Sequence, residues 1–164
     1  MFSLPLSAGE AELLQSLQEA EPEAVARIER EIVNLWSKSG SASMDFLLKR
    51  GRDAIDVQDW GLAIEHLTAL ADHAPDFAEA YHTRAIAYFR ADLIGPALGD
   101  LEQALALNPN HFGAMRGLAT IFEGLGDAKR AHQAYEMVLR LHPHDEEAQK
   151  GLERTEGEAF GREL

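Results

Sequence analysis

Residues 78–111 run AEAYHTRAIAYFRADLIGPALGDLEQALALNPNH, and they carry the clearest structural signal in the chain. Two apolar patterns with helical spacing lie within them, the second at Leu98, Leu101 and Leu105, and each predicts an amphipathic helix. Pro109 follows the second pattern. Proline ends helices because it lacks the backbone N–H donor that a helix interior requires. This stretch therefore predicts a pair of helices joined by a turn.

The same pattern recurs every 34 residues along the chain. Small residues, large apolar residues, alanines and prolines all share that period. The recurring positions are Gly51, Ala85 and Ala119; Leu47, Tyr81 and Met115; Leu67, Leu101 and Tyr135; Ala63, Ala97 and Ala131; and Pro75, Pro109 and Pro143. Self-similarity at a fixed period of this length is typical of stacked helical repeats. The helical pair is therefore predicted three times, over residues 44–77, 78–111 and 112–145.

This pattern resembles the tetratricopeptide repeat (TPR), in which large, small, aromatic, alanine and closing proline positions follow in fixed order. The first repeat departs from it at Ala54, where an aromatic residue is usual. The second and third repeats match at Tyr81, Ala85, Tyr88, Ala97, Leu101, Ala104 and Pro109, and at Met115, Leu118, Ala119, Phe122, Ala131, Tyr135, Val138 and Pro143. The resemblance implies an all-α fold, a right-handed superhelix of three helix-turn-helix repeats whose first helices line a concave groove.

Residues 1–43 are predicted to add an N-terminal helical pair, over about Ala8–Ala20 and Pro22–Ser37. The second helix has an apolar stripe that needs a surface to bury it, made by Val25, Ile28, Ile32, Leu35 and Trp36. Two alternatives stay open. The pair is a cap or degenerate repeat stacked on the first array helix, since repeat arrays need capped ends, or it docks into a groove or onto a second chain, as amphipathic helices do.

Residues 146–164 are predicted to form a C-terminal capping helix and a frayed tail. The helix is expected from Asp145 to about Thr155, with Ala148 and Leu152 on its inner side. The segment from Glu156 to the C-terminus is short, charged and contains glycine, so it is expected to fray.

The composition excludes several classes of function. A formal net charge of −13 disfavours binding to nucleic acid or to an anionic membrane. No apolar run is long enough for membrane insertion. Residues 1–6 lack the features of a signal peptide, so the expected location is the cytoplasm, or the periplasm if a leader has been removed.

No catalytic residue, cofactor or metal site is predicted. The chain has no cysteine. His142 and His144 flank Pro143 and would bind a metal only weakly. Histidines in such a turn are ordinarily solvated. Gly124 and Gly126 mark a turn between helices with no strand before them, so they do not indicate a phosphate loop.

By analogy with the family, a groove between the first helices is predicted to bind a partner. Its predicted binding residues are Arg52, Ile55, His82, Ile86, Phe89, Arg116 and Thr120, with Leu48 and Glu123 also facing it. Arginine binds carboxylates bidentately, so this mixture suits an extended or helical peptide with an acidic or carboxylate-bearing end. Acids outnumber bases on the second helices, which leaves the groove more positive than the remaining surface. The alternative is that these arginines only pair with neighbouring acids.

Two further arginines, Arg50 and Arg84, stand where the family usually has leucine. Their aliphatic stems cover apolar surface or their charged heads meet a partner, and both roles stay open.

Some members of the family clamp the C-terminal carboxylate of heat-shock chaperones with a Lys, Asn, Asn, Lys, Arg set. The matching positions here hold Leu48, Arg52, Thr83, Gly113 and Gly117. The set is absent, so chaperone-tail binding of that kind is not expected. The two glycines form a shallow hollow for a partner's backbone or simply reflect relaxed packing.

The expected function is that of a non-catalytic scaffold for protein–protein interaction, which binds a protein or peptide in its concave groove. A homo-oligomeric structural protein that self-associates through the N-terminal helices around Trp36 is one alternative. A secretion-type chaperone is another. An enzyme is disfavoured because no motif supports it.

Overall fold

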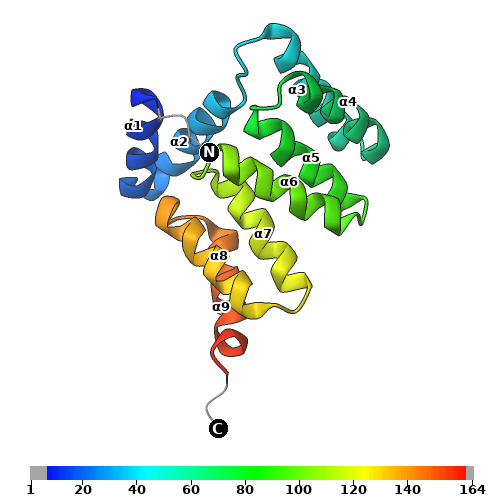
Figure 1. Ribbon diagram of the computed structural model, residues 1–164. Helices are drawn as coiled ribbons and strands as arrows, with labels where there is room; N and C mark the ends of the chain where they lie inside the picture. Colours follow the sequence, from blue (N-terminus) through cyan, green and yellow to red (C-terminus); the bar gives the residue numbers. More distant parts are fainter. Residues whose placement is uncertain (1–6, 162–164) are drawn as a thin grey trace. The chain divides into compact units, whose positions relative to one another are not determined.

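The computed structural model describes residues 7–161, and within them every regular element is an α-helix. The helices are α1 (Ala8–Glu19), α2 (Pro22–Trp36), α3 (Ala42–Asp56), α4 (Trp60–His73), α5 (Ala78–Arg90), α6 (Ile94–Leu107), α7 (Phe112–Gly124), α8 (Ala128–Leu141) and α9 (Glu146–Ala159) (Figure 1). The prediction of an all-α fold is confirmed. None of these helices combines the length and the apolar character that a membrane span requires. The expectations for residues 1–6 and 162–164 lie outside the described residues.

The described chain divides into two compact units. Unit 1 comprises residues 33–109 and unit 2 comprises residues 7–32 together with 110–161, so the division falls within α2. Unit 1 holds α3, α4, α5 and α6, the helices of the first two predicted repeats. Unit 2 holds α1, the first part of α2, and α7, α8 and α9.

Side chains at the helix starts explain where several helices begin. Asp59, Asp127 and Asp145 precede α4, α8 and α9, and each carboxylate accepts a hydrogen bond from the backbone N–H three residues later, at 3.1, 3.0 and 2.9 Å. Such caps satisfy backbone donors that have no partner within the helix. His111 does the same for α7 through Nδ1, 3.1 Å from the backbone nitrogen of Ala114.

The turn inside each predicted repeat contains one residue with a positive φ. These residues are Gln58, Asp92 and Gly126, with φ of 61°, 61° and 77°. They lie 34 positions apart, so the same left-handed step joins α3 to α4, α5 to α6, and α7 to α8. Glycine adopts this conformation without steric cost, whereas other residues are disfavoured there.

The core of unit 1 is built from small and aliphatic side chains where its helices pack in chain order. α3 packs on α4, α4 on α5 and α5 on α6, and α3 also meets α5. Gly51 on α3 lies directly over Leu67 on α4, and a Cβ at Gly51 would come within 3.0 Å of the leucine side chain. The small residue predicted at this position therefore permits the close approach of the paired helices. The buried residues of this core are Leu48, Ala54, Ala63, Leu67, Leu70, Ala71, Ala80 and Ala87.

The core of unit 2 centres on Tyr135 of α8, whose side chain is fully buried. α7 packs on α8 and α8 packs on α9. Gly151 of α9 faces the Tyr135 ring, and a Cβ there would come within 3.0 Å of three ring atoms. Phe112 of α7 is also buried, with its ring edge-on to His142 at a centroid distance of 5.2 Å.

The N-terminal helical pair packs with the third repeat in unit 2. α1 meets α8, as the blue and orange ribbons of Figure 1 show. The Gln18 side chain donates to the backbone oxygen of Arg140 at 3.1 Å, and the buried residues of the pair are Leu14, Leu17, Ile28 and Ile32. Within unit 2, residues 7–32 therefore pack against the third repeat of the same chain. Their role as a cap or degenerate repeat on the first array helix stays a prediction.

The C-terminal helix is longer than predicted. α9 continues to Ala159 instead of ending near Thr155, so fraying from Glu156 onward is wrong for these four helical residues. Phe160 follows it and lies edge-on to the ring of His132, with the centroids 4.9 Å apart. Gly161 then has φ of 73°. A glycine just beyond the last turn ends helices because it adopts this left-handed conformation easily.

Candidate partner-binding surface

The predicted binding residues are divided between the two units. Unit 1 carries Arg52 and Ile55 on α3, and His82, Ile86 and Phe89 on α5. Unit 2 carries Arg116 and Thr120 on α7. The surface is therefore described as two faces, called here the α3–α5 face and the α7 face.

A chain of polar contacts crosses the α3–α5 face. Arg52 donates through Nη2 to the carboxylate of Glu79 at 2.8 Å and to the Ser37 hydroxyl at 3.0 Å. His82 Nδ1 lies 3.3 Å from the same Glu79 oxygen. The Glu79 side chain is 5% exposed and that of Arg52 is 37% exposed. Arg52 is thus held in place by a buried acid while part of its side chain stays exposed.

Apolar side chains continue the α3–α5 face along α5. Ile86 and Phe89 are 36% and 39% exposed. They are three positions apart, which places them on the same side of the helix. Ile55 is half-buried against the core of unit 1. Leu48, also predicted to face the groove, is wrongly assigned, because its side chain is 2% exposed and belongs to that core.

On the α7 face, Arg116 is held by the residue that caps the next helix. Its Nη1 forms an ion pair with Asp145 Oδ2, while Oδ1 of Asp145 caps α9. The Arg116 side chain is 33% exposed and that of Asp145 is 2% exposed. Thr120 donates its hydroxyl to the backbone oxygen of Arg116 at 3.0 Å. Arg52 and Arg116 therefore both pair with neighbouring acids and keep an accessible part, and their binding of a partner stays a prediction.

An open pocket of about 510 Å³ adjoins Arg116 within unit 2. The first half of α2 forms one wall, with Val25 and Glu29, and the turn between α8 and α9 forms another, with His142 and His144. His142 Nε2 lies 3.3 Å from Glu29 Oε2, and this hydrogen bond, opposed by burial, lowers the pKa of Glu29. The sequence patterns did not indicate this pocket, because α2 and the turn are more than 100 residues apart.

The two histidines of this turn contact different groups. His144 Nε2 lies 3.1 Å from the backbone oxygen of Ala20, while His142 contacts Glu29. His142 is 2% exposed, so the expectation that both are solvated is wrong for it. Its Nδ1 is buried and has no hydrogen-bond partner among residues 7–161.

Two further arginines of the first helices, Arg84 and Arg50, lie over aromatic rings. Arg84 forms two hydrogen bonds to Asp100, at 2.7 and 2.8 Å, and lies over the rings of Tyr81 and Tyr88. The Asp100 hydrogen bonds raise the pKa of Arg84. Arg50 lies over Phe46, 5.6 Å from the ring centroid. For Arg84, the structural role is the one observed, since its side chain is 15% exposed.

Glu123, predicted to face the groove, instead links three helices of unit 2. It accepts a hydrogen bond from the Tyr135 hydroxyl at 2.7 Å and two from Arg154 on α9. The Arg154 hydrogen bonds lower the pKa of Glu123. Burial, followed by the hydrogen bond to Glu123, raises the pKa of Tyr135 to about 12.

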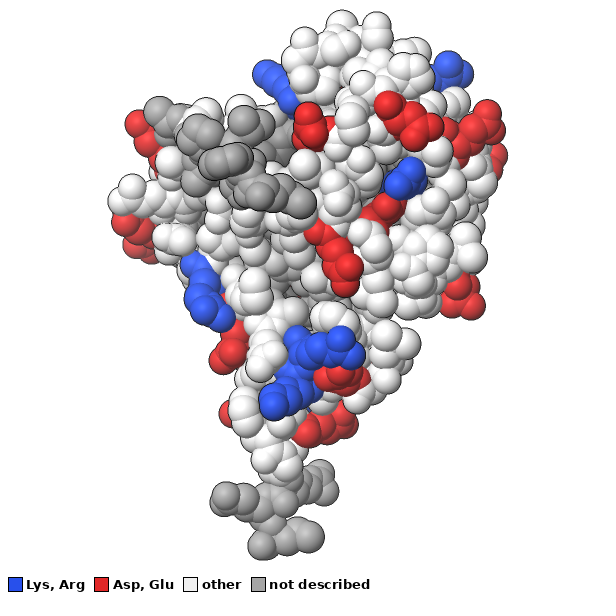
Figure 2. Space-filling model, viewed as in Figure 1, with Lys and Arg blue, Asp and Glu red and all other residues white. Residues whose placement is uncertain are grey.

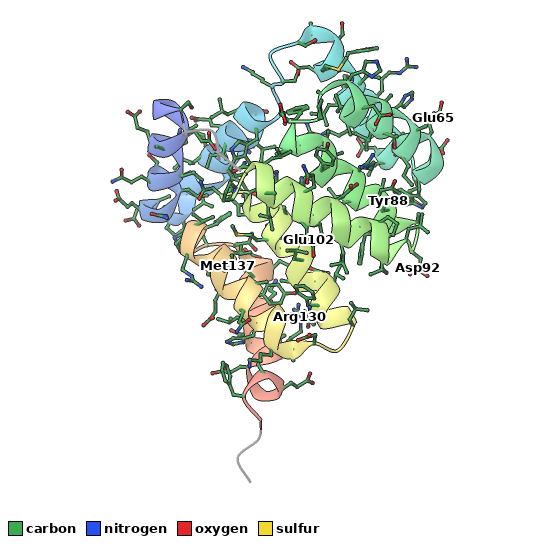
Figure 3. All side chains as sticks on the ribbon, in the orientation of Figure 1. Glu65, Tyr88, Asp92, Glu102, Arg130 and Met137 are labelled. Atoms are coloured by element: carbon green, nitrogen blue, oxygen red, sulfur yellow. The ribbon has the colours of Figure 1, made fainter. Side chains whose placement is uncertain are left out.

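Acidic side chains are spread over the second helices. Figure 3 shows Glu65 on α4 and Glu102 on α6, both exposed. On the face seen in Figure 2, lysine and arginine side chains gather over α8, with acidic side chains beside them. Met137 on the same helix is 44% exposed (Figure 3).

Comparison with known families finds the same repeat. A tetratricopeptide repeat model matches residues 48–95, and a second model of the same description matches residues 94–154. A TPR repeat-containing protein of Rhizobium etli is 31% identical over 136 residues, which is 83% of this chain and 67% of that protein. Human serine/threonine-protein phosphatase 5 is 29% identical over 102 residues, which is 62% of this chain but only 20% of the phosphatase.

Solved TPR domains have the same fold. The first TPR domain of Spaghetti (RPAP3), bound to the HSP90 peptide SRMEEVD, is 26% identical with a TM-score of 0.69 and covers 72% of this chain and 94% of that domain. MamA is 22% identical with a TM-score of 0.66 and covers 92% of this chain and 84% of MamA, which is a likeness of fold alone. Repeat pattern, helix arrangement and relatives agree, and the chain belongs to the tetratricopeptide repeat family.

Proposed function

We propose that this protein is a non-catalytic scaffold that binds a peptide or helix of a protein partner on the first helices of its repeats. The observation that carries the proposal is the α3–α5 face, where the partly exposed Arg52 shares the Glu79 carboxylate with His82 and the exposed Ile86 and Phe89 follow on α5. An anchored cation beside accessible apolar area suits a partner segment with both a carboxylate and large apolar side chains.

The solved relatives support peptide binding as the general mode. The first TPR domain of Spaghetti (RPAP3) is bound to an HSP90 peptide, and the second TPR domain of human RPAP3 is in complex with an HSP70 peptide. The residues of this chain argue for another partner. Where the chaperone clamp has Lys, Lys and Arg, this chain has Leu48, Gly113 and Gly117, none of which carries a charge. They offer no cation to a terminal carboxylate.

The test compares capture of partners by the wild-type chain and by a chain with Ile86→Ser and Phe89→Ser. Both residues are more than one-third exposed, so the variant is expected to fold. Bound proteins from extracts of the source cells are quantified by mass spectrometry. Partners of this face should fall at least about tenfold, the size of effect at central apolar contacts.

A matched control carries Met137→Ser on α8, where a side chain of similar exposure lies on a second helix. This control should retain the partners. Equal capture by all three proteins would remove the proposal. The control also reports any loss caused simply by exchanging an exposed apolar side chain for serine.

Self-association through the N-terminal helices predicts a different result. Leu35, next to Trp36 on α2, is 36% exposed and offers an apolar contact for a second copy. Light scattering over a concentration series would then show a mass that rises in the wild type and not in Leu35→Ser. A constant monomer mass in both leaves the scaffold proposal in place and removes this alternative. A secretion-type chaperone would be a special case of the scaffold, distinguished by the identity of the captured partner.

A further inference from the structure

The N-terminal helices reach the third repeat across more than 100 residues of sequence. Three polar contacts join them to the end of α8 and the turn that follows it. Gln18 donates to the backbone oxygen of Arg140 at 3.1 Å, and His144 Nε2 lies 3.1 Å from the backbone oxygen of Ala20. The third contact joins His142 and Glu29. Each contact involves at least one side chain, and none is a bond between two backbone groups.

The part of α2 that lies in unit 2, residues 22–32, is divided into a buried and a solvated side like a bound amphipathic helix. Ile28 is 5% exposed and Ile32 is fully buried, four residues apart on one side. On the outer side, Arg27 and Glu31 pair with each other at 2.7 Å, with 63% and 46% of their side chains exposed. Recognition of a helix by a groove uses this division, in which apolar anchors point inward and a solvated face points outward.

One acid of this helix, Glu29, faces His142 and the pocket that Arg116 lines. The hydrogen bond with His142 lowers the pKa of Glu29, burial opposes this, and the charge of Arg116 lowers it further. α2 thus presents to Arg116 the carboxylate that the family analogy expects of an external ligand.

The fit between α2 and the third repeat is incomplete. About 510 Å³ of open pocket remains between α2 and the turn after α8. The Glu29 side chain is 36% exposed, and Nδ1 of the neighbouring His142 is buried and has no hydrogen-bond partner in the described part of the chain. A helix that filled the pocket and satisfied this nitrogen would bind better than α2 does. Since a ligand shifts a conformational equilibrium only by its differential affinity, such a competitor could replace the resident helix.

We infer that the N-terminal helical pair is a resident ligand of the α7 face, which an amphipathic helix of a protein partner displaces by presenting its own carboxylate to Arg116 and His142. This inference rests on the proposed function. It specifies the kind of partner, and it states that α1 and α2 occupy the partner's site until the partner binds. α1 and α2 then act as a built-in competitor, and the apparent affinity for the partner is reduced by the fraction of chains that are closed.

The test uses a fluorescein-labelled synthetic peptide of residues 21–37, EPEAVARIEREIVNLWS, and three full-length proteins. These are the wild type, Glu29→Gln, which weakens the contact with His142, and Glu31→Gln, a control on the solvated side of the same helix. Anisotropy titration measures peptide binding. Glu29→Gln should bind the peptide about fivefold more tightly than the other two, since a half-exposed charged hydrogen bond is worth about 1 kcal/mol.

A peptide variant separates recognition from folding. The same peptide with glutamine at position 29 should bind the Glu29→Gln protein several-fold more weakly than the native peptide, and one with glutamine at position 31 should bind like the native peptide. Hydrogen exchange provides a second measurement, because opening of the pair should speed exchange of the α1 amides in Glu29→Gln and not in Glu31→Gln. Equal peptide affinity for the three proteins, or a peptide insensitive to position 29, would overturn the inference.

The outcomes also separate this inference from the proposed function. If the variant with Ile86→Ser and Phe89→Ser loses its partners but the peptide does not replace α2, the proposed scaffold function is supported and the inference of a resident helix is contradicted. If the peptide exchanges but the two serine substitutions leave capture unchanged, exchange at the α7 face is supported and the α3–α5 face is removed as the partner site.

Discussion

Unit 1 is closed by residues that are near one another in sequence, whereas unit 2 includes a segment that returns from far along the chain. The ion pair of the α3–α5 face joins Arg52 and Glu79, which are 27 residues apart, and the Arg84–Asp100 pair spans 16. In unit 2 the Arg116–Asp145 pair spans 29 residues, but the contact of Glu29 with His142 spans 113. Both units contain ion pairs between residues less than 30 positions apart. Among the described residues, unit 2 also depends on a contact with a distant segment.

This difference predicts that contacts between distant segments open more readily than contacts between neighbouring helices. Repeat arrays are stabilised mainly by contacts within a repeat and with the next one. A segment that closes a loop of more than 100 residues carries an extra entropic cost. The contacts of this segment are therefore expected to open first, while the ion pairs and helix caps between residues close in sequence persist.

The largest expected effect breaks the local packing of unit 2. Gly151→Ala places a methyl group against the ring of Tyr135, which is fully buried and held by Glu123. The ring has no free space to enter, so the free energy of unfolding should fall by about 3 kcal/mol. The equivalent change in unit 1, Gly51→Ala, meets the branched end of Leu67 and should cost about 1 kcal/mol. Urea denaturation measures both.

Gly157→Ala is the matched control, since a Cβ there meets nothing within 4 Å. It should stabilise α9 by up to about 1 kcal/mol, because alanine favours a helix more than glycine does. Equal losses for Gly151→Ala and Gly51→Ala would contradict the proposed difference between the two packing contacts.

A smaller effect concerns Asp145, which serves both Arg116 and the start of α9. Asp145→Ala removes the ion pair and the cap together and should lower the free energy of unfolding by about 2 kcal/mol. Asp145→Asn keeps an oxygen for the backbone of Ala148 and should lose about half as much. Asp127→Ala removes a cap from α8 as a reference. If both Asp145 variants behaved alike, the cap would contribute nothing measurable.

The smallest predicted effect is a pH dependence in unit 2. The folded state raises the pKa of Tyr135 from about 10 to about 12, so it holds the phenol proton more tightly than the unfolded chain does. The corresponding stability is complete below pH 10 and is lost as the pH rises towards 12. Tyr135→Phe should be less stable by about 1 kcal/mol below pH 10. Denaturation at several pH values should show this difference shrinking between pH 10 and 12, and a constant difference would contradict it.

The fold was predictable because its signal is local and repeated. The prolines, the small residues such as Gly51 and the apolar spacing each recur with the period of one repeat, and α1 and α2 were placed within one residue of their ends. The destination of α2 was not predictable. Its apolar stripe indicates that the helix packs against some surface. Which surface depends on complementarity with a turn more than 100 residues away, and neither segment reveals this by itself.

The candidate site was predictable only in part. The family register placed Ile86 and Phe89 on an exposed side of α5, where the structure has them. It could not show that Arg52 and Arg116 are held by Glu79 and Asp145, because acids are frequent in this chain and only coordinates select among them. Glu123 was misassigned for the same reason, since its partners come from α8 and α9.

The left-handed step shared by the three repeat turns has a consequence for how they differ in strength. Gln58 and Asp92 adopt with a side chain the conformation that Gly126 adopts without one. A residue with a Cβ is disfavoured there by about 1 kcal/mol relative to glycine. The turns of the first and second repeats therefore carry a conformational cost that the third lacks. On heating, these two turns should open at lower temperature than the turn between α7 and α8.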